Sequence, residues 1–142
     1  MAIAKPVSGT YCTVEKLDNG VYQFEFSERM RTEHKVRAGL DEFFDQIAEI
    51  YERESGGQVL RFMVLIEHSR LQEINYSIER AKALYKGHPH RPPTRTAMVV
   101  QQDNMARLLD TFIQLLHQKR DKVRFFGLSQ RNTAMDWLLR ED

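Results

Sequence analysis

The stretch VLRFMVLI, residues 59–66, decides the fold that this sequence predicts. It is almost continuously apolar and rich in residues that favour strands, and amphipathic helical patterns lie on both sides of it. A strand with one face in water alternates apolar and polar residues, whereas this stretch does not, so both faces of its sheet must be covered. The stretch therefore predicts an α/β domain in which helices pack on a sheet.

Two strand patterns precede it. Residues 11–17 and 21–27 flank Asp-Asn-Gly at 18–20, and the second pattern alternates aromatic with polar residues. Asn-Gly readily takes the positive φ angles of a two-residue turn, which predicts an antiparallel hairpin.

A long amphipathic helix is expected next, with Thr32 as its N-cap and its end near Glu54. Gly39 interrupts it at a cost of about 1 kcal/mol, and Gly56-Gly57 should end it, since glycine takes the left-handed C-terminal position without penalty. Its apolar stripe consists of Val36, Leu40, Phe43, Phe44, Ile47, Ile50 and Tyr51.

The rest of the chain alternates helices and strands. A second helix has its apolar positions between residues 74 and 85, strands follow at 96–101 and 123–126, and a third helical pattern spans 103–116 between them. In the last helix we expect Ser129 or Asn132 as the cap and a mostly buried Trp137 beside Ala134 and Leu138. The predicted order is ββαβαβαβα.

This order describes one mixed sheet of about five strands, an N-terminal hairpin plus parallel strands, flanked by four helices. We expect a single domain over residues 11–140 after a loose lead-in over residues 1–10. The 142 residues are 42% hydrophobic and 29% charged, with a net charge of +1, which is ordinary for a soluble domain and gives no field that favours nucleic acid.

Several functional classes find no support in the sequence. Cys12 is the only cysteine, so neither a disulfide framework nor a cysteine metal site is expected. His88 and His90 form a two-residue clip without a further ligand at a recognisable spacing, so no metal or other cofactor is predicted. No apolar stretch approaches the length of a membrane span and no signal-peptide core is evident, which predicts a cytoplasmic protein.

Charge is distributed unevenly. Residues 41–54 carry six acids against one base, and residues 80–95 carry five bases and two histidines without an acid. We interpret these segments as two solvated faces, with an anion-binding rim as the alternative for the basic one.

Ligands of such sheets bind beyond the carboxyl ends of the parallel strands. This rule selects the loops at 27–33, 67–72, 102–104 and 127–130. Their chemistry-bearing side chains are candidate ligand or partner contacts, the alternative being polar loops and helix caps: they are Arg31, His68, Ser69, Arg70, Asp103 and Asn104.

Four segments in order carry a family resemblance: Thr-Glu-His at 32–34, the stretch at 59–66, Arg-Thr-Ala-Met-Val-Val at 95–100, and Val-Arg-Phe-Phe at 123–126 followed by Ala-Met-Asp-Trp-Leu at 134–138. Together they resemble the SpoIIAA-like branch of the STAS superfamily (sulfate transporter and anti-sigma factor antagonist domains). The resemblance covers about residues 11–140.

The resemblance implies a bacterial regulatory domain that binds a protein or a hydrophobic or nucleotide-like ligand. Members carry a phosphorylatable serine in an Asp-Ser-Ser/Thr motif after the central strand. Here that loop reads Glu67-His68-Ser69-Arg70, which makes Ser69 the phosphorylation candidate.

We therefore expect a STAS-like binding or regulatory domain that is not an enzyme. Its partner would be a protein or a small lipid-like, hydrophobic or anionic ligand, and a homodimer is left open. The alternative is a small hydrolase or transferase whose catalytic residues lie on the four strand-end loops.

Overall fold

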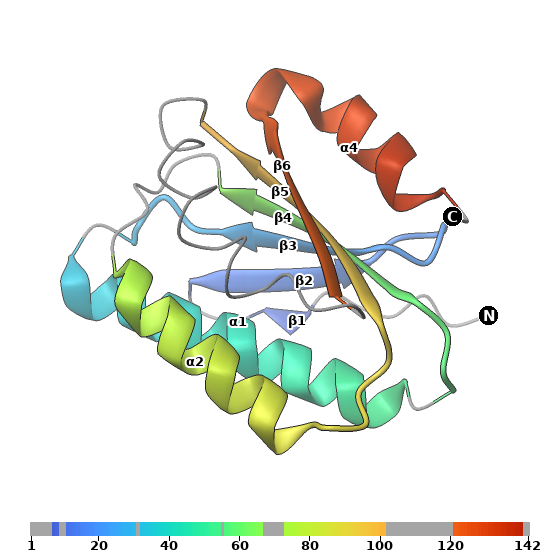
Figure 1. Ribbon diagram of the computed structural model, residues 1–142. Coiled ribbons are helices and arrows are strands. Elements are labelled where there is room, and N and C mark those ends of the chain that lie inside the picture. The colour runs from blue at the N-terminus through green and yellow to red at the C-terminus, as the bar shows by residue number, and fades with distance from the viewer. Residues whose placement is uncertain are drawn as a thin grey trace.

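The computed structural model describes residues 7–8, 11–30, 32–54, 56–66, 73–101 and 121–140. Its elements, in chain order, are β1 (Val7–Ser8), β2 (Cys12–Lys16), β3 (Tyr22–Phe26), α1 (Glu33–Arg53), β4 (Leu60–Ile66), α2 (Ile74–Gly87), β5 (Thr94–Val100), β6 (Asp121–Gly127), the 3-10 turn η1 (Leu128–Gln130) and α4 (Arg131–Leu138) (Figure 1).

The strands form one mixed sheet in the order β1-β2-β3-β4-β5-β6. The first three pair antiparallel, and β3 to β6 pair parallel. The predicted α/β class and mixed sheet are confirmed. The two-residue β1, within the expected lead-in, is additional to the five predicted strands, and the predicted helix at 103–116 lies outside the described residues.

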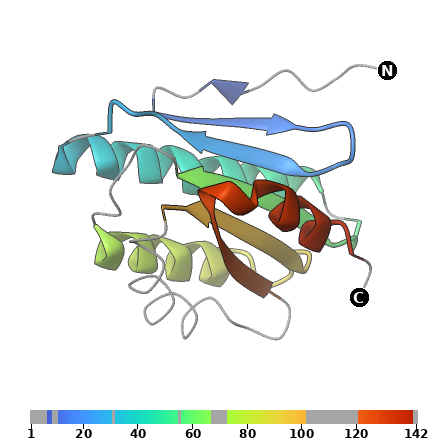
Figure 2. The same ribbon diagram turned by 90° about the horizontal axis from the view of Figure 1, so that it is seen from above.

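The described helices cover both faces of the sheet. In Figure 1, α1 and α2 lie side by side on one face and α4 lies on the other. Figure 2 looks down onto α4, with the sheet behind it and α1 beyond the sheet. Both faces of the central strands are therefore covered by helices, as the stretch at 59–66 predicts.

Two apolar cores result, one on each face. Along β4, Phe62 and Val64 face α1 and α2, whereas Met63 and Leu65 face α4. All four are at most 3% exposed. The period of two along a strand sends successive side chains to opposite faces, so a strand covered on both faces is apolar at nearly every position.

The hairpin between β2 and β3 is correctly predicted, but its turn is not. The Leu17 amide donates to the Val21 carbonyl at 2.8 Å, and the Gly20 amide donates to the Leu17 carbonyl at 2.9 Å. Gly20 alone in this turn has a positive φ, +89°. This geometry is a three-residue loop with a glycine bulge in place of the expected two-residue turn.

Helix α1 begins as predicted. The Lys35 amide donates to the Thr32 hydroxyl at 3.3 Å, so Thr32 is the N-cap. The helix ends at Arg53, ahead of the glycine pair, and of that pair only Gly57 has a positive φ, +78°. The glycines therefore turn the chain toward β4 and do not supply the cap itself.

Packing explains why a glycine stands at position 39 inside α1, which the sequence pattern does not reveal. A Cβ at this position would lie 2.6 Å from the sulfur of Met30 and 3.2 Å from the Cβ of Tyr11. Met30 is itself buried. The missing side chain thus lets α1 approach the chain segments on either side of the hairpin.

The cap predicted for the last helix is wrong. Neither Ser129 nor Asn132 caps it; α4 follows the 3-10 turn, and the Gln130 side chain accepts from the Gly127 amide at 3.0 Å. Ala134 and Leu138 are fully buried, whereas Trp137 is only partly buried and packs against Phe126. Trp137 therefore lies at the margin of the second core.

Candidate functional site

The six residues predicted to line a site at the carboxyl edge of the sheet lie outside the described residues: they are Arg31, His68, Ser69, Arg70, Asp103 and Asn104. That site stays a prediction. The described residues bring together a different feature, a cavity between α1, α2 and the sheet.

The cavity is apolar and draws its walls from five elements. Its volume is about 70 Å³, or about 540 Å³ when all the empty space out to its mouth is included. The lining residues are Phe43, Phe44, Ile47 and Tyr51 from α1, Ala81, Leu84 and Tyr85 from α2, Phe62 from β4, Thr94, Thr96 and Met98 from β5, and Val123 from β6.

The floor of the cavity is one row of the sheet. Phe62, Thr96 and Val123 are register partners on three neighbouring parallel strands. They lie in the amino-terminal halves of these strands, away from the carboxyl ends at Ile66 and Val100. The cavity is therefore distinct from the edge that the strand-end rule selects.

Helical spacing explains the roof. Phe44, Ile47 and Tyr51 recur every three or four residues and present one face of α1. On α2, Ala81 and Leu84 lie on the face turned toward the sheet. Alanine is the smallest side chain among the described lining residues, so a larger side chain at this position would extend into the cavity.

Aromatic contacts fix several of the walls. Phe43 packs edge-to-face on Phe24 with ring centroids 5.0 Å apart and on Phe44 at 5.1 Å. Phe24, fully buried, also meets Phe62 at 5.6 Å. These are favoured ring geometries, so the rings that border the cavity are held by others behind them.

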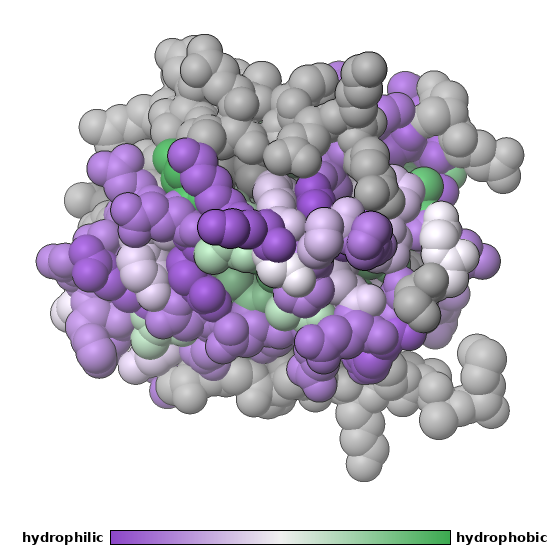
Figure 3. Space-filling model, turned by 60° about the horizontal axis from the view of Figure 1, so that its bottom comes forward, coloured by the Kyte–Doolittle hydropathy of each residue, from purple (hydrophilic) through white to green (hydrophobic). Residues whose placement is uncertain are grey.

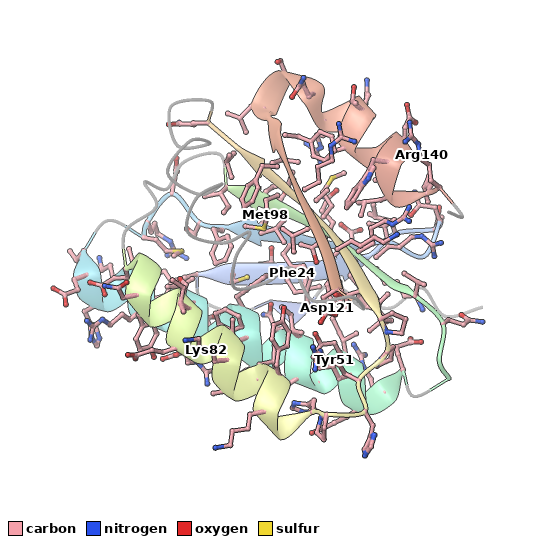
Figure 4. All side chains as sticks on the ribbon, in the orientation of Figure 1. Phe24, Tyr51, Lys82, Met98, Asp121 and Arg140 are labelled. Carbon is pink, nitrogen blue, oxygen red and sulfur yellow. The ribbon has the colours of Figure 1, made fainter. Side chains whose placement is uncertain are left out.

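A buried ion pair lies behind one wall. The Arg91 guanidinium donates to the Asp121 carboxylate, which is 0% exposed and also accepts from the Thr94 hydroxyl at 2.7 Å. The same guanidinium lies 4.0 Å from the centroid of the Tyr85 ring. Figure 4 shows Asp121 at the start of β6, near Tyr51 of α1. Each charge thus has its partner within the protein.

The two tyrosines of the cavity are neutral phenols at pH 7. Burial raises the pKa of Tyr85 to about 12. Burial also raises the pKa of Tyr51 well above its ordinary value, and the nearby Tyr85 and Asp121 add to this effect while Arg91 opposes it. Both hydroxyls remain protonated and polar without carrying charge.

Polar side chains join α1 to α2 beside the cavity. Arg37 binds Glu73 at 3.0 Å, and Arg80 reaches both Asp41, at 3.1 Å, and Asp45, at 3.0 Å. Figure 3 shows this face of the molecule as mostly hydrophilic, with a small hydrophobic area near its centre. Asp41 and Asp45 of α1 thus pair with Arg80 in the middle of α2, whereas Arg37 of α1 pairs with the acid that precedes α2.

This arrangement corrects the interpretation of two separate solvated faces. Of the five bases in residues 80–95, Arg80 pairs with the acids of α1, and Arg91 and Arg95 are buried at 8% and 7% exposure. Lys82 and Lys86 are exposed. Three of the cations of the supposed anion-binding rim are therefore engaged within the fold.

The other reactive side chains among the described residues have structural surroundings. Cys12 is fully buried, its thiol lies 3.5 Å from the Gln46 side-chain oxygen, and burial raises its pKa far above the ordinary value. His88 contacts the Leu84 carbonyl through Nδ1 at 2.9 Å. In the described ranges no three His, Cys, Asp or Glu side chains gather in the geometry of a metal site.

The chain matches no protein-family model, and neither a curated protein nor a solved structure is significantly similar to it. Among the described helices, none combines the length and the apolar character needed to cross a bilayer.

The cavity is not evident from the sequence, because its lining residues appear there as ordinary core positions. The signal that was present is small: Ala81 interrupts a stripe of larger residues, and Thr94 and Thr96 place hydroxyls on the same face of β5 as Met98. Asp121 is likewise not evident, since it precedes the apolar part of its strand.

Proposed function

We propose that this chain is a non-catalytic binding domain that takes a small apolar molecule into the cavity between α1, α2 and the sheet. The observation that carries the proposal is the lining itself: aromatic and aliphatic side chains from five elements, with hydroxyls as the polar groups. Ligand pockets have this composition, a mainly apolar wall with a few polar groups that set orientation.

The chemistry of the lining favours binding over catalysis. The described side chains that border the cavity include no histidine, cysteine, carboxylate or lysine, and their tyrosines hold their protons at neutral pH. General acid–base and nucleophilic catalysis need such groups within hydrogen-bond reach of one another. A molecule bound here would be held by hydrophobic contacts and by individual hydrogen bonds to the hydroxyls.

The volume sets the size of the ligand. An engineered apolar cavity of about 150 Å³ binds benzene, whereas this one measures about 70 Å³ and is open to solvent at its mouth. A small ring system such as indole, or a short alkyl chain, suits these dimensions, with part of the molecule in the mouth. A long-chain lipid would require α1 and α2 to separate.

A regulatory role is the second part of the proposal. The STAS-like resemblance supports a cytoplasmic regulatory domain whose protein partner, a second copy of the chain included, contacts the loop with His68 and Ser69. In this scheme the cavity senses a small molecule and the loop at the end of β4 carries the output.

The test is ligand binding with a variant that fills the cavity. Indole and 1-hexanol are titrated by calorimetry into the parent and into Ala81→Leu, whose larger side chain would extend into the cavity. Ala83→Leu is the matched control, because Ala83 lies on the same helix and is exposed. We expect binding to the parent and to Ala83→Leu, and at least a tenfold weaker affinity in Ala81→Leu.

Two results would contradict the proposal. One is the failure of both probes to bind the parent protein at millimolar concentrations. The other is unchanged affinity in Ala81→Leu, provided that its thermal unfolding shows a folded protein, because the bound molecule would then lie elsewhere.

A further inference from the structure

Two full charges, Arg91 and Asp121, contact residues of the cavity wall and pair with each other. The Asp121 carboxylate accepts from Arg91 and from Thr94, and Arg91 also donates to the His88 carbonyl at 3.2 Å. Arg91 and Asp121 are 8% and 0% exposed. Tyr85 and Thr94, which line the cavity, both contact this pair.

We infer that the cavity selects small uncharged ligands, ring systems or short chains with few hydrogen-bonding groups, and rejects their carboxylate counterparts. The inference rests on the proposed function and specifies its ligand class. The cation that would attract a carboxylate is already paired, and the described lining residues carry no charge.

Desolvation gives the direction of the selectivity. An anion that enters an apolar cavity loses its water, and this cost is recovered only where a cation or several donors replace the water. The Arg91 guanidinium is held by Asp121, whose own charge would repel an incoming carboxylate. An uncharged molecule of the same shape has neither this desolvation penalty nor the repulsion.

The threonine hydroxyls of the lining would position the polar group of the ligand. The Thr94 hydroxyl donates its proton to Asp121, so its oxygen is left as an acceptor. Thr96, two residues further along β5 and on the same face of the strand, adds a second hydroxyl on the floor of the cavity. An N–H or O–H donor on the ligand matches these oxygens, as in indoles, phenols and alcohols.

The test compares two probes of equal shape. Indole-3-carboxamide and indole-3-carboxylate are titrated into the parent protein at pH 7, with indole as the reference. We expect the carboxamide to bind at least tenfold more tightly than the carboxylate. Failure of indole itself would count against the proposed function. With indole bound, equal affinities, tighter binding of the carboxylate or failure of the carboxamide would overturn this inference alone.

Asp121→Asn tests the cause of the selectivity. It removes the carboxylate charge and leaves the Arg91 guanidinium beside the cavity, so we expect the preference for the carboxamide to fall at least fivefold. Asp136→Asn, an exposed change on α4, is the control. A folded Asp121→Asn with an unchanged preference would overturn the inference, and if this variant does not fold, the parent comparison decides.

Discussion

Arg61 and Arg95 are register partners on β4 and β5, and both donate hydrogen bonds to carbonyls at the end of α4. Arg61 reaches the Leu138 carbonyl at 2.6 Å, and Arg95 reaches those of Trp137 at 3.0 Å and Arg140 at 2.9 Å. The last carbonyls of a helix lack partners in the helix and carry partial negative charge. Two neighbouring strands thus cap a helix of eight residues.

Replacing Arg95 with Met should loosen α4 and destabilise the protein by about 1.5–3 kcal/mol, the range for hydrogen bonds to charged groups. Arg95 is buried, and its guanidinium also lies 5.3 Å from the centroid of the Trp137 ring. Urea unfolding gives the stability, and amide hydrogen exchange locates the effect in α4. Lys122→Met, at the exposed register partner on β6, is the control. Equal exchange rates in α4 for both variants would contradict the capping role.

The buried pair of Arg91 and Asp121 predicts a strongly non-additive mutant cycle. Arg91→Met should destabilise the protein by about 3–5 kcal/mol, because it leaves a buried carboxylate without its cation. The double variant Arg91→Met with Asp121→Leu should cost clearly less than the two single changes added together. Chemical unfolding of the four proteins measures the cycle. Additive costs would mean that the pair is not coupled.

Tyr85 predicts a loss of stability at high pH. An unfolded tyrosine titrates near 10, whereas burial raises the pKa of folded Tyr85 to about 12. Between these values the unfolded chain loses the proton first, so the free energy of unfolding should fall as pH rises. Tyr85→Phe should show a shallower fall from pH 9 to 11.5. Identical slopes in urea unfolding of parent and variant would refute this.

Gly39 should not behave as an ordinary helical glycine. At a position with open space, Gly→Ala stabilises a helix by about 0.5–1 kcal/mol. Here the added methyl would meet the Met30 side chain at 2.6 Å, so we expect Gly39→Ala to destabilise the protein by about 1 kcal/mol. In a Met30→Ala background the same change should become neutral or stabilising. A higher melting temperature for Gly39→Ala alone would show that the packing of α1 accommodates a methyl group at this position and would contradict the prediction.

Periodicity predicted the parts of the fold that repeat. The unbroken apolar stretch at 59–66 identified a strand covered on both faces, and the stripe from Val36 to Tyr51 identified α1 and its buried face. The Thr32 cap followed from a local rule and is confirmed. These features depend on neighbours in the sequence, so a single chain suffices to find them.

Features that depend on distant residues were not predictable in this way. The partner of Asp121 is thirty residues away in the sequence, and Arg95 finds its acceptors in a helix beyond β6. The cavity exists because α1 and α2 meet the sheet without filling the space beside Ala81. Local sequence patterns do not show whether side chains fill the space between the helices and the sheet. Only the packed structure reveals this.

Methyl NMR tests the central claim, that the cavity binds a small uncharged apolar molecule, most directly. Met98 lines the cavity, and Met63 lies one strand away on the opposite face of the sheet. Their methyl signals, assigned with Met→Leu variants, are followed while indole is added. A bound ring should shift the Met98 methyl through its ring current and leave Met63 unchanged. A shift of Met63 without Met98, or no shift of either at saturating indole, would contradict the account.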